Sequence, residues 1–267
     1  KFQPIKGFLG SKFVGLDNFE KLFAMPDFFT ALRNTLIISF FKIVGNLVVA
    51  VVFALLLNEV SHGWFKRMAQ TITYLPYFLS WVILAGIFIE FLSPGSAASG
   101  PGVLNNILLS LHVIDEPIYF LGNNATFRST IVITDIWKSF GYNAIIYLAA
   151  LTSIDPSLYE AAQVDGAGRW QQTIHITLPG IAPFIALMTI LSIGGILNAG
   201  FDQIFNMYNP AVYETGDIID TLTYRLGLEN QQYSLSATVG LFRSAVSCIL
   251  VLSAYKLAER FAGYRVW

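Results

Sequence analysis

Five ionisable side chains lie within or at the end of long apolar stretches, where burying a charge is costly and usually marks a function. They are Lys42, Asp135, Lys138, Asp202 and Arg243. Asp135 and Lys138 are three residues apart and can meet on one face of a helix. The pattern predicts an ion pair that joins helices or lies at the water boundary. A proton relay would need histidines or more carboxylates there, and His62, His112 and His175 lie elsewhere.

The patterns that would mark an enzyme are missing from the sequence. It has no G-x-x-x-x-G-K-[ST] stretch to hold nucleotide phosphates. It also has no spaced Cys and His ligands for a metal ion and no Gly-x-Ser-x-Gly turn. The single cysteine, Cys248, lies in an apolar run and is interpreted as a small buried hydrophobe. We therefore expect no catalytic residue, metal site or cofactor in this chain.

Composition indicates a membrane protein. Of the 267 residues, 55% are hydrophobic and 12% are charged, whereas soluble domains carry about 25% charged residues. The formal net charge of −1 disfavours a nucleic-acid partner, which would require a basic surface.

Five apolar runs have the length of about 20 residues that a spanning helix needs. They cover residues 35–57, 72–92, 129–151, 180–201 and 236–258. Pro76 lies in the second run and can kink it. Segment 93–126 is a loop by composition, and segment 206–235 is polar. The predicted fold class is an all-α, polytopic helix bundle, with 34–267 as the core domain.

Residues 1–33 precede this core and are mixed in character. Four apolar side chains fall on one face of a short predicted helix: Leu16, Phe19, Leu22 and Phe23. Such an amphipathic helix commonly lies at a membrane interface.

A polar stretch of regular design, residues 152–178, lies between the third and fourth runs. Asp155 can cap a helix that Pro156 begins. Gly166 and Gly168 permit the backbone turn that ends this helix. A second short helix is predicted from about Arg169 to Thr177, leading into the next run at Leu178-Pro179. The product is a compact helical pair outside the bilayer.

The spacing in this stretch is Glu-Ala-Ala, three residues, Gly, nine residues, Ile, one residue, Leu-Pro. It resembles the cytoplasmic coupling loop of permeases in bacterial ATP-driven (ABC) importers, of the maltose-permease-like superfamily and the type I fold. The resemblance implies that this loop contacts an ATPase. The residues it assigns to coupling are Glu160, Ala161, Ala162, Asp165, Gly166, Arg169, Ile176, Leu178 and Pro179.

The resemblance extends over nearly the whole chain from Phe13. Residues 209–221, 224–228, 233–234 and 237–242, with Trp267, resemble the branch of these permeases that imports polysaccharides and oligosaccharides. Thr223 is a departure, because a bulkier residue is expected there. The family implies a homologous second permease, two ATPase subunits that carry ATP and Mg²⁺, and an extracytoplasmic solute-binding protein.

Orientation follows from the basic residues. Loops 58–71, 152–178 and 255–267 share one side and carry six Lys or Arg, against Arg225 alone in the opposite loops. This distribution favours a cytoplasmic location for the first set. Residues 1–33 add five basic residues to the other side and make the count even, so the coupling-loop resemblance decides. It implies a bacterial inner-membrane location with a cytoplasmic C-terminus, and a further span before Lys1.

A sugar path would use amide and carboxylate hydrogen bonds to hydroxyls, with aromatic faces against the sugar rings. Candidates in and after the third and fourth runs are Trp137, Tyr142, Asn143, Tyr147, Ser192, Asn198, Phe201, Asp202 and Gln203. Each can also be a structural residue, because aromatic and amide side chains commonly pack or bridge membrane helices. An acidic sugar could pair with Lys42, Lys138 or Arg243.

Two other classes of protein remain as alternatives. An ion-gradient-driven carrier should show inverted repeats and buried titratable relays, and neither is visible. A membrane-embedded glycosyltransferase should carry paired carboxylates near an interface. Asp217 and Asp220 come nearest to this, but they lie in the segment that matches the permeases.

Overall fold

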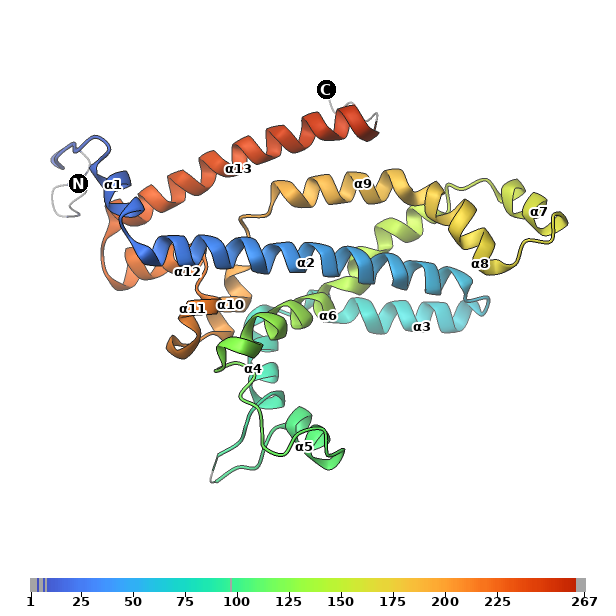
Figure 1. Cartoon of the computed structure of the whole chain (residues 1–267), viewed down its shortest axis with the longest axis horizontal. Coiled ribbons are helices and arrows are strands. Elements are labelled where there is room, and N and C mark those ends of the chain that lie inside the picture. Colours follow the sequence, from blue (N-terminus) through green and yellow to red (C-terminus); the bar gives the residue numbers. More distant parts are fainter. Residues whose placement is uncertain (1–3, 5–6, 8, 97, 263–267) are drawn as a thin grey trace. The chain divides into compact units, whose positions relative to one another are not determined.

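The structure is a computed structural model that describes residues 4, 7, 9–96 and 98–262. The predictions that involve Lys1, Lys6, Arg265 and Trp267 lie outside these residues. In the described part of the chain every element is a helix (Figure 1). The chain forms two compact units: unit 1 from Lys1–Phe41, Leu79–Ile133 and Ile196–Cys248, and unit 2 from Lys42–Phe78, Thr134–Gly195 and Ile249–Trp267. Three helices contribute to both units: α2 (Pro26–Glu59), α6 (Asn124–Leu151) and α13 (Tyr233–Ala262).

Among the described residues, three helical stretches are long and apolar enough to cross a membrane. They are Pro26–Glu59, Arg169–Gly194 and Tyr233–Leu257, and a bent pair, Gly63–Phe78 with Trp81–Phe91, would make a fourth. Helix α6 has 28 residues but is not among them, because Arg128, Asp135 and Lys138 interrupt its apolar sequence. The predicted polytopic, all-α fold class is confirmed.

The second predicted run is not one straight helix. It is divided into α3 (Gly63–Tyr74), η2 (Leu75–Phe78) and α4 (Trp81–Phe91). Pro76 cannot donate a backbone hydrogen bond, and the extended Ser80 starts a new helix by accepting from the N–H of Ile83 at 3.4 Å. The predicted kink is therefore a break.

The fourth predicted run, 180–201, also ends earlier than expected. Helix α9 covers Leu178–Gly194, and a short α10 begins at Phe201 and ends at Met207. Between them Gly200 has a φ of +92°, a conformation that glycine adopts without steric cost. Glycine residues within the apolar run therefore let the chain leave the helix and turn.

Segments 93–126 and 206–235 are more ordered than their composition predicts. The first contains α5 (Val103–Ser110). The second contains η4 (Pro210–Val212), α11 (Tyr213–Gly216), α12 (Ile219–Tyr224) and η5 (Arg225–Glu229). The predicted amphipathic helix is α1 (Asp17–Phe23), which lies beside the start of α13 in unit 1 (Figure 1). There the rings of Phe23 and Phe242 have centroids 5.9 Å apart.

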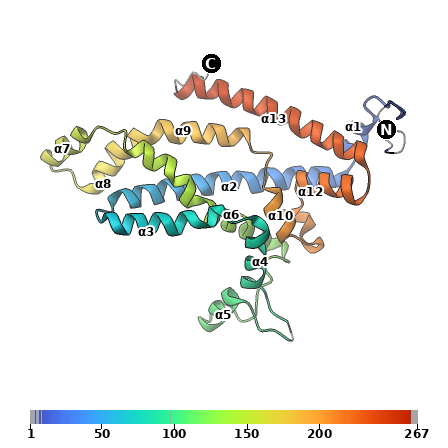
Figure 2. The same ribbon diagram turned by 180° about the vertical axis from the view of Figure 1, so that it is seen from behind.

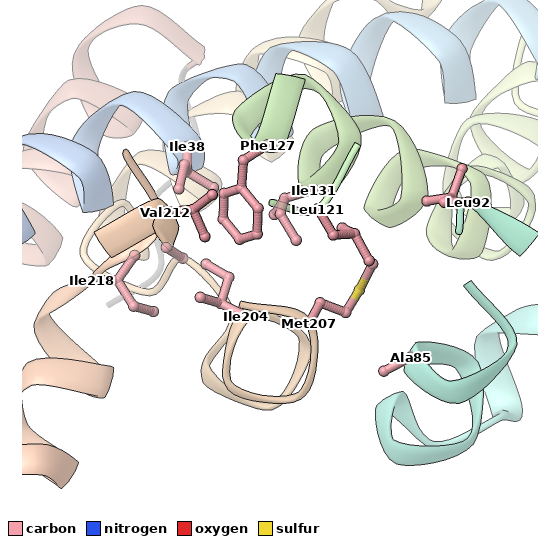
Figure 3. Packing of buried hydrophobic residues seen from close by; sticks show 11 residues of the cluster. Ile38, Ala85, Leu92, Leu121, Phe127, Ile131, Ile204, Met207, Val212 and Ile218 are labelled. Carbon is pink, nitrogen blue, oxygen red and sulfur yellow. The ribbon is translucent and has the colours of Figure 1, made fainter. Parts of the chain in front are cut away.

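Unit 1 has a core that joins segments far apart in the sequence (Figure 3). Ile38 of α2, Phe127 and Ile131 of α6, and Ile204 and Met207 of α10 are all buried there. The inner face of α10 thus belongs to this core.

Unit 2 packs the later part of α2 against α6 and α9. Its core includes Ala50 and Ala54 of α2, Ala144 and Tyr147 of α6, and Ile181 of α9. Small residues let helix backbones approach closely, as is common between membrane helices.

Contrary to the prediction, Cys248 on α13 is exposed, because this helix presents an apolar face outward as well as inward.

Candidate functional site

The predicted coupling segment forms two short helices in unit 2. Helix α7 covers Pro156–Val164, and Asp155 caps it by accepting a hydrogen bond of 2.9 Å from the N–H of Ser157. This bond stabilises the carboxylate and lowers the pKa of Asp155. Gly166 follows with a φ of +78°, and the next N–H, of Ala167, donates to the carbonyl of Ala162 at 2.8 Å. The predicted cap and glycine turn are both present.

The second part of this segment is continuous with α9. Helix α8 covers Arg169–Gln172, a π-helical turn follows at Thr173–Thr177, and α9 begins at Leu178. The predicted second helix from about Arg169 to Thr177 is present, and it continues into the span without a break. A displacement of α8 can pass directly into α9.

Two side-chain contacts within unit 2 involve the helical pair. The hydroxyls of Tyr159 and Thr177 are 3.0 Å apart and join α7 to the π-helical turn. Arg169 forms a surface ion pair of 3.3 Å with Glu59, near the end of α2. Figures 1 and 2 show α8 beside that end of α2.

Most of the predicted coupling residues are accessible. Those with exposed side chains or backbone are Glu160, Ala161, Asp165, Gly166, Arg169 and Pro179, while Ala162, Ile176 and Leu178 are half-buried. Three apolar side chains that sequence reasoning did not select are also exposed: Leu158 (51%), Val164 (88%) and Trp170 (74%). Exposed apolar groups that gather on one segment commonly mark an interaction surface. We call these three the coupling patch.

The charged residues of the third run form an interhelical cluster in unit 2. Lys42 Nζ lies 3.1 Å from Asp135 Oδ1, and Asn46 Nδ2 donates to Asp135 Oδ2 at 2.9 Å. Asn143 Nδ2 donates to Asn46 Oδ1 at 3.2 Å. Lys138 Nζ donates to the carbonyl of Tyr77 at 2.8 Å. The ion pair that joins helices is therefore between Asp135 and Lys42 of α2, whereas the sequence predicted Lys138 as the partner of Asp135.

The nine candidate residues for a sugar path are divided between the two units. In unit 2, Trp137 and Tyr142 are exposed, and Tyr142 stacks on Tyr77 with centroids 3.8 Å apart. Ser192 is exposed and donates to the carbonyl of Met188 at 2.8 Å. Tyr147 is only 4% exposed within the core, which favours a structural role.

In unit 1, the candidates lie at and before α10. Asn198 is exposed and accepts from the N–H of Gly200 at 3.3 Å, and Asp202 is also exposed. Gln203 is fully buried and donates to the carbonyl of Ile131 at 2.8 Å, so its amide supports the core. Phe201 is half-exposed and lines a cavity of about 550 Å³.

The polar segment after α10 is fixed to the helices of unit 1. Arg225 forms a two-bond contact with the buried Asp217, at 3.1 and 2.6 Å. Asn34 of α2 donates to the carbonyls of Glu214 and Asp217, and it accepts from Arg128 of α6 at 2.7 Å. A second ion pair joins Asp220 to Arg243 of α13. Sequence reasoning treated this segment as a loop and missed these contacts.

These features define a class of protein: a polytopic membrane component with an accessible helical pair joined directly to a span. Among the described residues no group of three or more His, Cys, Asp or Glu side chains could hold a metal ion.

Comparisons with known proteins agree with this class. Residues 46–262 match the family described as binding-protein-dependent transport system inner membrane component. The chain is 42% identical to the polygalacturonan/rhamnogalacturonan transport system permease protein YteP of Bacillus subtilis, over 97% of this chain and 79% of that protein. It is 33% identical to the lactose transport system permease protein LacF of Rhizobium radiobacter, over 90% and 77%.

Solved structures give the same result. A chain of a bacterial ABC transporter involved in the import of the acidic polysaccharide alginate is 40% identical, with a TM-score of 0.87 over 94% of this chain and 85% of that one. An amino acid ABC transporter is 14% identical with a TM-score of 0.57, which shows the fold alone. The chain belongs to the family of inner-membrane components of binding-protein-dependent transport systems. It is a transport permease subunit and not an enzyme.

Proposed function

We propose that this permease imports oligosaccharides or polysaccharides, and acidic ones in particular. The observation that carries the proposal is similarity of 40% or more, over nearly the whole chain, to a permease named for polygalacturonan and rhamnogalacturonan and to a chain of an alginate-importing ABC transporter. The predicted charge partners for an acidic sugar are already engaged, because Lys42 pairs with Asp135, Lys138 binds a carbonyl and Arg243 pairs with Asp220. Because these three cations already have partners, we do not assign them to the carboxylates of the substrate.

The proposal includes the partners that the family resemblance implied. Two ATPase subunits that hold ATP and Mg²⁺ would dock on the coupling segment, where the coupling patch offers apolar contact area and Glu160 offers a carboxylate. An extracytoplasmic binding protein would deliver the sugar. The loops at 58–71 and 152–178 and the C-terminus would lie in the cytoplasm.

Uptake measurements test the substrate class. Proteoliposomes that contain the whole importer and its binding protein are expected to accumulate oligomers of galacturonate or alginate. Neutral oligosaccharides, lactose and an amino acid serve as comparisons. Uptake of lactose alone would show that the substrate is a neutral and not an acidic sugar. Uptake confined to an amino acid would refute a carbohydrate function.

The second permease is expected to be a homologous chain and not a second copy of this one. The expectation rests on the family resemblance, because an exposed apolar surface within a membrane can face lipid and does not identify a partner. Native mass measurement of the intact complex should give one copy of this chain. Two copies of this chain would contradict the heterodimer.

A further inference from the structure

A row of aromatic rings follows the outer face of α10 and continues onto α11 and α12, and sequence reasoning selected only Phe201 among these residues. Phe201 and Phe205 stack with centroids 5.0 Å apart, and Phe205 lies 6.3 Å from Tyr208. Tyr208 in turn stacks on Tyr213 at 5.2 Å. Tyr224 of α12 closes the side of the row, 4.7 Å from Phe205. We call these five residues the aromatic row.

The aromatic row lies opposite the core face of the same helix. Gln203, Ile204 and Met207 are buried, at 0 to 3% exposure, whereas Phe201, Phe205 and Tyr208 are half-exposed. Positions 201, 205 and 208 follow the spacing that places residues on one helical face. The sequence therefore assigns aliphatic and amide groups to packing and aromatic rings to the accessible side.

A cavity lies at each end of the aromatic row. The Phe201 cavity, about 550 Å³, is lined by Phe201, Tyr224 and Tyr233 with the polar side chains of Asp220 and Ser236. The Tyr208 cavity, about 480 Å³, is lined by Tyr208 and Tyr119 with Asn206, Asn209 and Ser93. Both volumes lie in the range of about 300–1,000 Å³ that is usual for small-molecule sites.

Both cavities combine aromatic side chains with a few hydroxyl, amide or carboxylate groups, and the lining of the Phe201 cavity is mostly apolar. Burial, together with the neighbouring Tyr213, raises the pKa of Tyr208, so its hydroxyl stays neutral and able to donate. Among the described residues that line the two cavities there is no Lys or Arg. Asp202 is exposed on the same helix, and a carboxylate is costly against lipid. The face therefore suits contact with a solvated ligand that contains rings.

We propose that the Phe201 cavity and the Tyr208 cavity are two subsites of one saccharide track, with Phe205 holding the sugar chain between them. The inference rests on the proposed carbohydrate function. The C–H faces of sugar rings lie against the aromatic faces, whose negative quadrupole attracts them. Hydroxyls bind the flanking polar groups, and the carboxylates of an acidic sugar point away from Asp220 and Asp202. The track thus reads ring shape and not charge.

The test uses the whole importer with its binding protein, and a galacturonate trimer as the probe. Phe205→Leu keeps an apolar side chain but removes the ring face, and it should lower the maximal uptake rate about three- to tenfold. Phe205→Tyr keeps the face and should stay within about twofold of the unmodified protein. Phe65→Leu, at an exposed phenylalanine of α3, is the matched control and should have no effect.

Equal uptake by Phe205→Leu and Phe205→Tyr would overturn the track, since a packing role does not require a ring face. A second measurement reports occupancy directly. In a Cys248→Ser background, which removes the single cysteine, Tyr208→Cys should react with a maleimide more slowly when the loaded binding protein and ATP are present. Unchanged labelling would also overturn the track. If the unmodified importer takes up no glycan, the proposed carbohydrate function is wrong. If it takes up the trimer but Phe205→Leu and Phe205→Tyr behave alike, only the saccharide track is wrong.

Discussion

Gly166→Val and Glu160→Lys are each expected to abolish substrate-driven uptake while the chain stays inserted and folded. Gly166 has a φ of +78°, and a Cβ there would meet no atom within 4 Å. The effect of valine is therefore backbone strain, of about 1–3 kcal/mol or more for a β-branched residue. Relieving the strain changes the turn between α7 and α8, which separates Leu158 and Val164 from Trp170 within the coupling patch. Lysine at position 160 reverses the charge offered to the ATPase.

The measurement is uptake and ATP hydrolysis by the reconstituted importer with loaded binding protein. Gly168→Ala is the matched control, because Gly168 has a φ of −70° and an added Cβ would meet only Gln171 Oε1 at 3.9 Å. It should behave as the unmodified protein does. If Gly166→Val and Glu160→Lys both keep normal stimulated hydrolysis and uptake, residues 152–178 are not the coupling element.

The second large effect concerns the buried ion pair of unit 2. Asp135→Leu leaves the cation of Lys42, whose side chain is 9% exposed, without its carboxylate. Removing one partner of a buried pair typically costs about 3–5 kcal/mol of stability, because the remaining charge stays desolvated. Lys42→Met combined with Asp135→Leu should recover much of this loss, because the double variant buries no charge.

The thermal unfolding midpoint of the purified complex measures both variants. Glu59→Gln is the control, since Glu59 and Arg169 are 48% and 82% exposed and such pairs contribute about 0–1 kcal/mol. A double variant as unstable as Asp135→Leu would contradict the assigned structural role. Retained uptake in the double variant would further show that Lys42 does not read the charge of the sugar.

The coupling segment could be predicted from the sequence because its determinants are local. Asp155 caps the helix by accepting from the N–H two residues ahead, Pro156 fits the first helical position, and Gly166 supplies the left-handed turn. Each depends on neighbours within one or two turns of helix, so residue type and spacing suffice. Hydrophobic length likewise indicated the long apolar helices at the first, fourth and fifth runs, because the bilayer imposes that length on each helix separately.

Contacts between segments far apart in the sequence needed the tertiary structure. Asp135 lies three residues from Lys138 but 93 residues from Lys42, and only the packing of α2 against α6 selects Lys42 as the partner of its ion pair. The same holds for the hydrogen bonds that Asn34 of α2 donates to the carbonyls of Glu214 and Asp217. The composition of segment 206–235 predicted a polar loop, yet its polar groups form hydrogen bonds and ion pairs inside unit 1.

The aromatic row shows most clearly where sequence reasoning stops. Phe201, Phe205 and Tyr208 fall across the boundary between an apolar run and a polar segment, so neither assignment predicted a helix there. The turn at Gly200 begins α10, and the burial of Ile204 and Met207 decides which face of α10 packs inward. A sequence specifies that a helix has two faces, but only the core it packs against determines which face remains open to a ligand.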